Sequence, residues 1–358
     1  MQRFSCPTEL ICGMQALDAL RNETAESAVL VSDPYFVQSG EADRISALLS
    51  AKVTIFDKVT PDPPLRTAVS GAAMLDQLQP ELLLALGGGS AIDCAKAMLC
   101  LAAKRPRFIA IPTTSGSGSE VTAFSILTHD RVKYPLIDPT IRPDCAILDP
   151  ALAAAMPGAL AADTGMDTLS HCLEALAATG ASNFTAALAL QSFHTVYHQL
   201  PASYRGDSSA RAAIHIAASM AGIAFNNAGL GVCHALSHAL GGAFHLAHGR
   251  LNGILLPAVI AFNAGSTHAY ARLAHFCGFS SAADAIAVRS LIAALRRLRR
   301  TLSLPATLSE AGISENALQL AESDLITVAK KDACLATNPR PVMDDDLKQL
   351  LWEAYQHG

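Results

Sequence analysis

Aromatic and charged residues are scarce in this chain of 358 residues. Only 5% of the residues are aromatic and 16% are charged, whereas 51% are hydrophobic. A chain so poor in charge and so rich in hydrophobic residues does not have the composition of a disordered segment. It is long enough for two domains of ordinary size.

The chain also has no excess of positive charge. Its 26 Lys and Arg residues stand against 31 Asp and Glu residues, which gives a formal net charge of −5. A surface that binds nucleic acid or an anionic membrane needs a positive excess. The composition therefore excludes both partners and favours a small molecule.

Three further signals are absent. The apolar stretch at residues 82–103 is interrupted by Asp93 and Lys96, so it lacks the run of about 18 apolar residues that a membrane span requires. The first seven residues contain no apolar segment of an export signal, so we expect a cytoplasmic protein. Nine cysteines without a Cys-x-x-Cys pair indicate reduced thiols rather than a disulfide framework or a zinc ribbon.

Short β-branched or leucine-rich runs recur in the first 150 residues, and each predicts one buried strand. Helical patterns at residues 41–49, 65–79 and 92–103 lie between several of these runs. Such alternation predicts a parallel sheet with helices on both faces, the plan of nucleotide-binding folds. The predicted strands lie at residues 28–32, 53–56, 82–86, 108–111 and 146–148.

The character of the sequence changes after the last of these strands. Alanine and leucine dominate, strand-like runs largely vanish, and Met156-Pro157-Gly158 is typical of a hinge. We therefore predict an α/β domain at residues 1–155 and an all-α domain at residues 156–358. No Asp, Glu, Lys or Arg lies between Arg211 and Arg250, which predicts buried helices, yet five of the twelve histidines occur there.

Two loops of small residues follow neighbouring predicted strands. Gly87-Gly88-Gly89-Ser90 lies between a strand and a helix, where backbone amides at the positive end of a helix dipole bind phosphate well. It is not the Gly-x-Gly-x-x-Gly fingerprint, and a tight turn is the alternative. A second loop, residues 112–122, adds hydroxyl groups. Because open α/β sheets bind ligands at the carboxyl ends of their strands, the two loops together predict dinucleotide binding.

Asp33 follows the first clear predicted strand. A carboxylate at this place would bind the adenosine ribose and repel the 2′-phosphate of NADP, which predicts a preference for NAD. The alternative is a turn aspartate that precedes Pro34.

A carboxylate and several histidines predict a metal site in the second domain. Asp167 and His171 are four residues apart on a predicted helix and so face the same side. One carboxylate with several imidazoles fits Fe²⁺ or Zn²⁺ and is a poor fit to Ca²⁺ or Mg²⁺. A hydrogen-bonded core histidine is the alternative for any single member. The further candidates are His234, His238, His245 and His248.

Those four histidines cannot meet on one straight helix. At 1.5 Å per residue the first and last would lie about 21 Å apart, far more than one ion spans. The chain must turn, and we expect Gly241-Gly242 to permit the turn. Spacing alone does not choose among the four.

Four motifs occur in the order and spacing of one enzyme family: Gly87-Gly88-Gly89-Ser90, residues 113–122, Thr164-Gly165-Met166-Asp167, and His234-Ala235-Leu236-Ser237-His238. On these motifs nearly the whole chain resembles the iron-containing (group III) alcohol dehydrogenases. The resemblance implies their dehydroquinate synthase-like fold, an α/β dinucleotide-binding domain with a parallel sheet followed by an all-α metal-binding domain. Segments 59–63, 133–136, 229–231 and 338–341 are most similar to the propanol and ethanol dehydrogenases linked to bacterial microcompartments.

The resemblance implies a reaction and its site residues. An Fe²⁺ ion, with Zn²⁺ as the alternative, would be held by Asp167, His171, His234 and His248, and His238 would relay a proton beside it. The enzyme would interconvert short primary alcohols, such as 1-propanol and ethanol, with their aldehydes by hydride transfer to or from NAD. The NAD site between the domains would be lined by Asp33, Gly87, Gly88, Gly89, Ser90, Asp93, Thr113, Thr114, Thr122 and Lys133.

The resemblance further implies a homodimer or larger assembly, with the microcompartment shell or its enzymes as partners. A polyol dehydrogenase or a dehydroquinate synthase-like lyase of the same fold would use three protein ligands, so His171 as a fourth ligand argues against both. A catalytically silent nucleotide- and metal-binding subunit is the remaining alternative. It is supported only by departures from the family pattern, chiefly Ala247, where a proline is usual, and Arg250.

Overall fold

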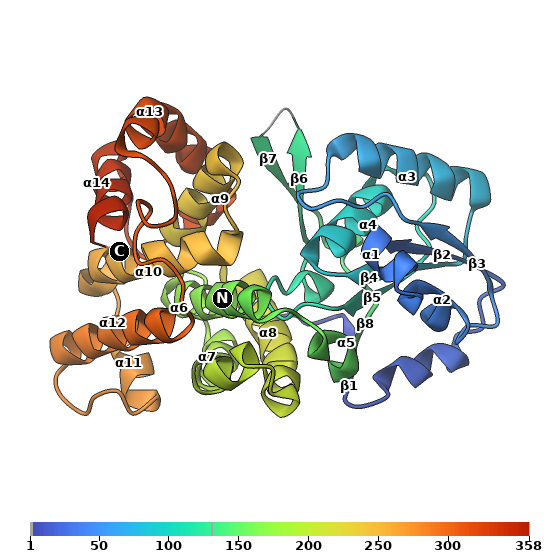
Figure 1. The fold of residues 1–358 in the computed structure, drawn as a ribbon, viewed down its shortest axis with the longest axis horizontal. Coiled ribbons are helices and arrows are strands. Elements are labelled where there is room, and N and C mark those ends of the chain that lie inside the picture. The colour runs from blue at the N-terminus through green and yellow to red at the C-terminus, as the bar shows by residue number, and fades with distance from the viewer. Residues whose placement is uncertain (1–2, 130–131, 358) are drawn as a thin grey trace. The chain divides into compact units, whose positions relative to one another are not determined.

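The computed structural model describes residues 3–129 and 132–357. They form two compact units, the N-terminal unit (Ser5–Met156) and the helical unit, which begins at Pro157 and takes in Phe4 (Figure 1). Phe4 joins the helical unit because its ring stacks on that of Phe184, with the centroids 5.3 Å apart.

A parallel sheet forms the centre of the N-terminal unit (Figure 1). Six strands are arranged in the order β1-β8-β5-β4-β2-β3, and each neighbouring pair is parallel. The five predicted strands are confirmed to within one or two residues, whereas β1 was missed because it is short and mostly exposed. The strands are β1 (Glu9–Cys12), β2 (Ser27–Ser32), β3 (Lys52–Phe56), β4 (Leu82–Gly87), β5 (Arg107–Pro112) and β8 (Cys145–Leu148).

Helices cover both faces of this sheet, and the alternation of side chains along each strand feeds two cores. In β4, Leu83 and Ala85 pack with residues of α3 and α4. Leu82, Leu84 and Leu86 pack on the other face with residues of η1 and α2. The helices are η1 (Ala16–Asn22), α1 (Pro34–Gln38), α2 (Glu41–Ser46), α3 (Leu65–Leu78), α4 (Gly89–Leu101), η2 (Ser119–Val121), η3 (Pro139–Ile141) and α5 (Pro150–Ala154).

An antiparallel pair, β6 (Phe124–His129) and β7 (Val132–Ile137), lies outside the main sheet. The sequence did not predict it. Pro135 within β7 lacks a backbone N–H and weakens a strand pattern.

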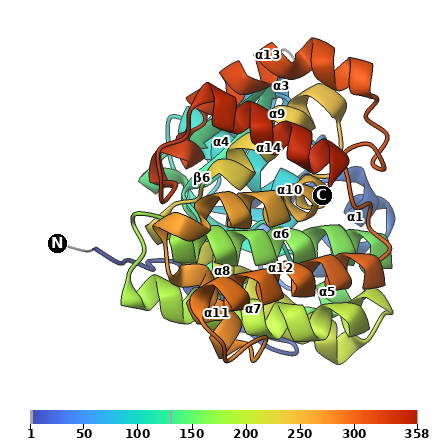
Figure 2. The ribbon, with the colours of Figure 1, turned by 90° about the vertical axis from the view of Figure 1, so that its left-hand side faces the viewer.

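The helical unit is built around α6 (Gly158–Ala177), in which every residue from Gly165 to Ala177 is buried. Polar side chains on this helix must therefore find partners inside the protein. Helix α10 lies beside α6 (Figure 2). The remaining helices are α7 (Asn183–Tyr204), α8 (Ser208–Ala228), α9 (Val232–Phe244), α10 (His248–Asn263), η4 (Ala264–Ser266), α11 (Ala269–Phe276), α12 (Asp284–Thr301), α13 (Glu315–Lys331), η5 (Ala333–Thr337) and α14 (Asp344–Gln356).

The predicted turn at Gly241-Gly242 is wrong, because both glycines lie inside α9. The chain turns after Phe244, where His245 adopts a left-handed backbone conformation with φ +55°. Two glycines weaken a helix by only about 1 kcal/mol each. The packing of α9 against α10 and α13 outweighs that cost.

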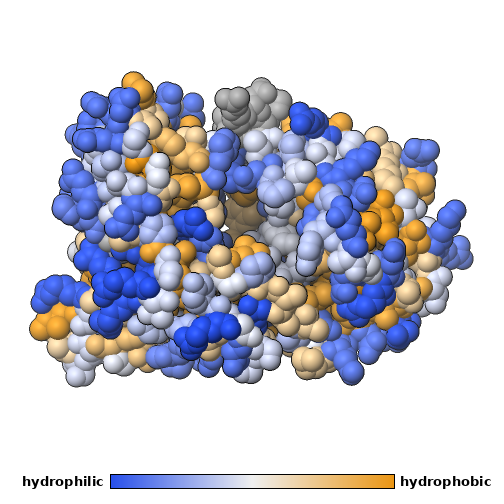
Figure 3. All heavy atoms as spheres, viewed as in Figure 1, coloured by the Kyte–Doolittle hydropathy of each residue, from blue (hydrophilic) through white to orange (hydrophobic). Residues whose placement is uncertain are grey.

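None of the described helices is by itself long and apolar enough to span a membrane; α8 and α9 pass that test only as a pair bent by 107°. On the face shown in Figure 3, hydrophilic and hydrophobic residues are interspersed over both units.

Candidate metal centre

Three helices of the helical unit bring a carboxylate and three imidazoles together. Asp167 and His171 lie one turn apart on α6, His234 lies in the first turn of α9, and His248 is the first residue of α10. The left-handed residue His245 reverses the chain between α9 and α10. After this turn the ring of His248 lies beside that of His234, with the centroids 5.3 Å apart.

The distances suit one small cation. Oδ1 of Asp167 lies 3.9 Å from Nε2 of His171, 3.9 Å from Nε2 of His234 and 3.6 Å from Nε2 of His248. Four donors at about 2.1 Å from a tetrahedral ion are about 3.4 Å apart. The ligand atoms of Asp167, His234 and His248 all lie within 4.8 Å of one another. The residues present therefore fit a transition-metal ion.

His171 stands slightly apart from that set of three. Its ring stacks on the ring of His234, with centroids 4.7 Å apart, and on that of Phe225. Burial lowers the pKa of His171 to about 4, so its imidazole is neutral near pH 7, the form that binds metals. Within the described part of the chain its Nδ1 makes no hydrogen bond, and Nε2 faces Asp167.

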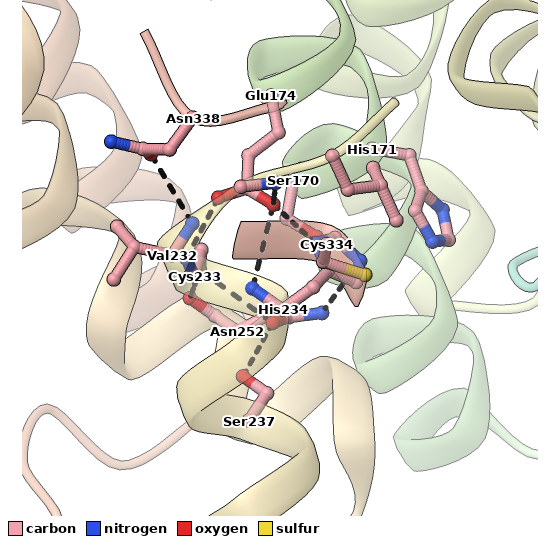
Figure 4. A network of polar contacts seen from close by, with 12 residues as sticks. Ser170, His171, Glu174, Val232, Cys233, His234, Ser237, Asn252, Cys334 and Asn338 are labelled. Carbon is pink, nitrogen blue, oxygen red and sulfur yellow. Dashed lines mark hydrogen bonds and ion pairs between the residues drawn. The ribbon is translucent and has the colours of Figure 1, made fainter. Parts of the chain in front are cut away.

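Glu174 is a residue of this centre that the sequence analysis missed (Figure 4). Its Oε2 lies 2.6 Å from Nδ1 of His234, and both side chains are buried. Burial alone would lower the pKa of His234, but the hydrogen bond and charge of Glu174 raise it overall. Glu174 follows Asp167 by seven residues and His171 by three, so helical periodicity alone would have placed it on their face of α6.

Asn252 is a second residue that was missed. Its Nδ2 donates to Oδ1 of Asp167 at 2.8 Å and lies 3.2 Å from Nε2 of His248. Its Oδ1 accepts hydrogen bonds from Ser237 and Cys233 (Figure 4). These two donors orient the amide so that the NH₂ group faces the carboxylate of Asp167.

His238 lies beside the centre. Its ring stacks almost parallel on that of His248, at 4.9 Å and 11°. Its Nδ1 lies 2.7 Å from Oδ2 of Asp332, a third residue that was missed. Burial would raise the pKa of Asp332, but the hydrogen bond and charge of His238 lower it to about 2. The carboxylate is therefore charged near neutral pH and fixes the His238 ring.

The two departures from the family pattern are accommodated. Arg250 forms a two-pronged ion pair with Asp163, with Nε 3.2 Å from Oδ1 and Nη2 3.0 Å from Oδ2. Its charge is thereby balanced one turn before Asp167. A Cβ atom on Gly249 would lie 1.9 Å from the carbonyl oxygen of Asp163. The first turn of α10, which follows Ala247, is thus pressed directly against α6.

In the N-terminal unit the two small-residue loops pack together at the carboxyl ends of β4 and β5. Gly87 accepts a backbone hydrogen bond from Thr113 at 3.0 Å. A Cβ on Gly88 would lie 3.0 Å from Oγ1 of Thr114. Gly88, the N-cap of α4, has no side chain with which to cap the first amides of the helix. Such amides are available to an anion such as phosphate.

Asp33 has the turn role that the sequence offered as the alternative, and its carboxylate also lies beside the glycine-rich loop. Its Oδ1 accepts the N–H groups of Tyr35 (2.9 Å) and Phe36 (3.3 Å) and so caps α1. Its Oδ2 lies 3.8 Å from the position of a Cβ on Gly87, beside the glycine-rich loop.

Three other predicted coenzyme residues make contacts within the protein. Asp93 accepts hydrogen bonds from Oγ of Ser119 (2.7 Å) and from the backbone N–H of Ile126 (3.0 Å). Thr122 contacts the fully buried Lys96. Burial lowers the pKa of Lys96 to about 8. These contacts tie the second loop to α4. Lys133 pairs with Asp62 at 2.7 Å.

Comparisons with known proteins agree over the whole chain. A family described as "Iron-containing alcohol dehydrogenase" matches residues 7–150, and one described as "Fe-containing alcohol dehydrogenase family, C-terminal" matches residues 161–355. The chain is 40% identical to 1-propanol dehydrogenase PduQ of Salmonella typhimurium, covering 99% of this chain and 100% of the relative. It is 38% identical to an NADPH-dependent butanol dehydrogenase of Clostridium saccharobutylicum, covering 100% and 99%. The solved sulfoacetaldehyde reductase of Bifidobacterium kashiwanohense, in complex with NAD⁺, is 25% identical, with a TM-score of 0.90 over 99% of both chains.

Proposed function

Because the chain belongs to the iron-containing alcohol dehydrogenase family, it is an oxidoreductase that acts on alcohols and aldehydes, and we propose that Asp167, His171, His234 and His248 bind its metal ion. The observation that carries this assignment is the position of Asp167 Oδ1 within 3.9 Å of all three Nε2 atoms. Fe²⁺ is the proposed ion, in keeping with the family, and Zn²⁺ suits the same donors. When bound, such an ion polarises the oxygen of the alcohol or aldehyde.

His238 is the proposed proton relay. Its Nδ1 is engaged by the charged carboxylate of Asp332 at 2.7 Å, which leaves Nε2 to take up or release the proton of the alcohol. The ring stacks on His248 and so lies next to the proposed ligands without belonging to them. Asp332 holds the ring in one orientation, with Nε2 free of that contact.

NAD(H) is the proposed coenzyme, bound by the two packed loops of the N-terminal unit. The uncapped N-terminus of α4 supplies amides for the phosphates. The reductase similar to this chain binds NAD⁺, whereas the similar butanol dehydrogenase is NADPH-dependent, so the choice depends on local residues. The carboxylate of Asp33 beside Gly87 favours NAD, because it repels a 2′-phosphate.

Short primary alcohols and their aldehydes are the proposed substrates, because the two similar dehydrogenases are named for propanol and butanol. The homodimer or larger assembly, the cytoplasmic location and the association with a microcompartment stay predictions. The silent-subunit alternative loses its support at Arg250, whose charge is balanced by Asp163.

Turnover is the direct test. Protein loaded anaerobically with Fe²⁺ is mixed with NADH and propanal or acetaldehyde, and the absorbance of the reduced nicotinamide is followed. We expect it to fall with either aldehyde. Flat traces with several short aldehydes would contradict the proposal and favour a silent subunit. Metal analysis of anaerobically purified protein identifies the ion.

A further inference from the structure

A single carboxylate, that of Glu174, contacts both a proposed ligand and the start of the helix that carries this ligand. We propose that Glu174 is a positioning residue that fixes His234 as a metal ligand while it caps α9. This inference rests on the proposed metal site and adds to it a residue that binds no metal itself.

The capping contacts come from the first turn of α9. Oε2 of Glu174 accepts the N–H of Gly231 at 2.9 Å, and Oε1 accepts the N–H of Cys233 at 2.7 Å (Figure 4). The N–H of His234 lies 3.4 Å from Oε2. Helix N-terminal amides need acceptors, and a negative charge there is stabilised by the helix dipole. The amides at the N-terminus of α9 thus stabilise the carboxylate of Glu174, a residue that is only 3% exposed.

The same carboxylate sets the tautomer of His234. At 2.6 Å from Oε2, Nδ1 must carry the ring proton, because an ionised carboxylate only accepts hydrogen bonds. The lone pair of His234 then lies on Nε2, which faces Oδ1 of Asp167. A carboxylate that holds the second nitrogen of a ligating histidine orients the ring and increases its basicity.

Glycine at position 231 is part of this arrangement. A Cβ there would lie 2.8 Å from Oε1 of Glu174 and 2.8 Å from Oδ1 of Asn338. Asn338 caps the neighbouring amide of Val232 at 3.2 Å and contacts none of the four proposed ligands through any hydrogen bond described here. Asn338 therefore provides a matched control that shares the capping role but not the contact with His234.

The test compares metal-free wild type, Glu174→Gln and Asn338→Ala by titration with Co²⁺, followed through its visible absorption. A glutamine has a single oxygen and cannot accept the converging N–H groups of both Cys233 and His234. We expect Glu174→Gln to weaken Co²⁺ binding by about 10–100-fold and to change the intensity of the bands. Asn338→Ala lowers thermal stability but keeps the wild-type affinity and spectrum.

The outcomes distinguish a failure of this inference from a failure of the proposed metal site. Wild type that binds no Co²⁺ overturns the proposed metal site. Wild-type binding by Glu174→Gln, or equal weakening in both variants, overturns the inference alone. If Glu174→Gln does not fold, ¹⁵N NMR spectra of histidine-labelled, metal-free wild type test the inference instead. The signal of His234 is the one that is lost in His234→Gln. The inference requires the proton on Nδ1 of His234, and a proton on Nε2 contradicts it.

Discussion

At the scale of single residues, His234 and His238 share one hydrogen-bonding pattern, in which Nδ1 contacts a carboxylate. Glu174 holds Nδ1 of His234 and Asp332 holds Nδ1 of His238, at 2.6 and 2.7 Å. The two dyads are alike, but only Nε2 of His234 faces Oδ1 of Asp167. Position relative to Asp167, and not the hydrogen-bonding pattern, therefore separates a proposed ligand from a proposed relay.

We expect His248→Ala and His238→Ala to differ in metal content. His248→Ala loses a donor 3.6 Å from Asp167 Oδ1 and should lose the metal. His238→Ala keeps all four proposed ligands, so its metal content stays near wild type while turnover falls by about 10²–10⁴-fold. Metal analysis and steady-state kinetics measure the two effects. Equal metal loss in both variants would refute this division of roles.

The charge and the capping contact of Asp33 can be separated by substitution. Asp33→Ser keeps an oxygen able to cap α1 but removes the negative charge beside Gly87. We expect the ratio of NADPH to NADH turnover to rise by about tenfold or more, because the repulsion of a 2′-phosphate is removed. Asp33→Asn serves as a second uncharged variant. An unchanged ratio in both would remove the proposed role of Asp33.

At the scale of helices, the metal centre depends on the close approach of α6 and α10. Three features within one turn of α10 hold the two helices together. Gly249 lacks a Cβ and so lets the backbones approach, Arg250 forms an ion pair with Asp163, and Asn252 donates a hydrogen bond to Asp167. Each contact lies beside a proposed ligand. The usual proline is absent at Ala247, and these contacts fix the first turn of α10 in its place.

Gly249→Ala should therefore damage the site. Its Cβ would lie 1.9 Å from the backbone oxygen of Asp163, which cannot move without shifting α6. We expect a loss of about 1–3 kcal/mol in unfolding free energy and weaker Co²⁺ binding. Gly253→Ala on the same helix is the control, because the only tight contact of its Cβ would be with the flexible end of Met166 at 3.2 Å, and its other contacts with Met166, at 3.5 Å, are of ordinary length. Urea unfolding and Co²⁺ titration compare the two, and wild-type Co²⁺ affinity in Gly249→Ala would be contrary to expectation.

At the scale of the whole molecule, the proposed metal ligands and coenzyme loops belong to different compact units. The four proposed ligands all lie in the helical unit, and the two small-residue loops lie in the N-terminal unit. The single tryptophan of the chain, Trp352, lies in α14 of the helical unit and donates to Glu322 at 2.6 Å. Its fluorescence therefore reports on the unit that would bind the metal.

Removing the metal should lower the unfolding midpoint reported by Trp352. Metal at 100 times its dissociation constant stabilises the folded state by about 2.7 kcal/mol, which corresponds to a shift of about 5–10 °C for a unit of this size. The measurement is thermal unfolding of Fe²⁺- or Zn²⁺-loaded protein before and after chelation. His248→Ala, which should bind no metal, should show no shift. An equal shift in that variant would place the metal elsewhere.

Local pattern was sufficient to predict most of the sheet. Runs such as residues 82–86 are short, largely apolar and followed by a glycine, a proline or an aspartate, and they form β4 and its neighbours. The pair β6–β7 was not predicted because Pro135 breaks the strand pattern. The turn between α9 and α10 was misplaced because tertiary packing carries α9 through Gly241-Gly242.

The sequence by itself determined the chemistry available to the centre, since a carboxylate and several histidines, most of them in a stretch free of charged residues, already indicated a transition metal, and the family motifs chose among the histidines. Only the tertiary structure decided which polar side chains hold those residues. Glu174 is 60 residues from His234, Asn252 is 85 from Asp167, and Asp332 is 94 from His238. Helical periodicity extends over a few turns, whereas partners so distant in sequence meet only when buried helices pack and each buried polar group must find a hydrogen bond.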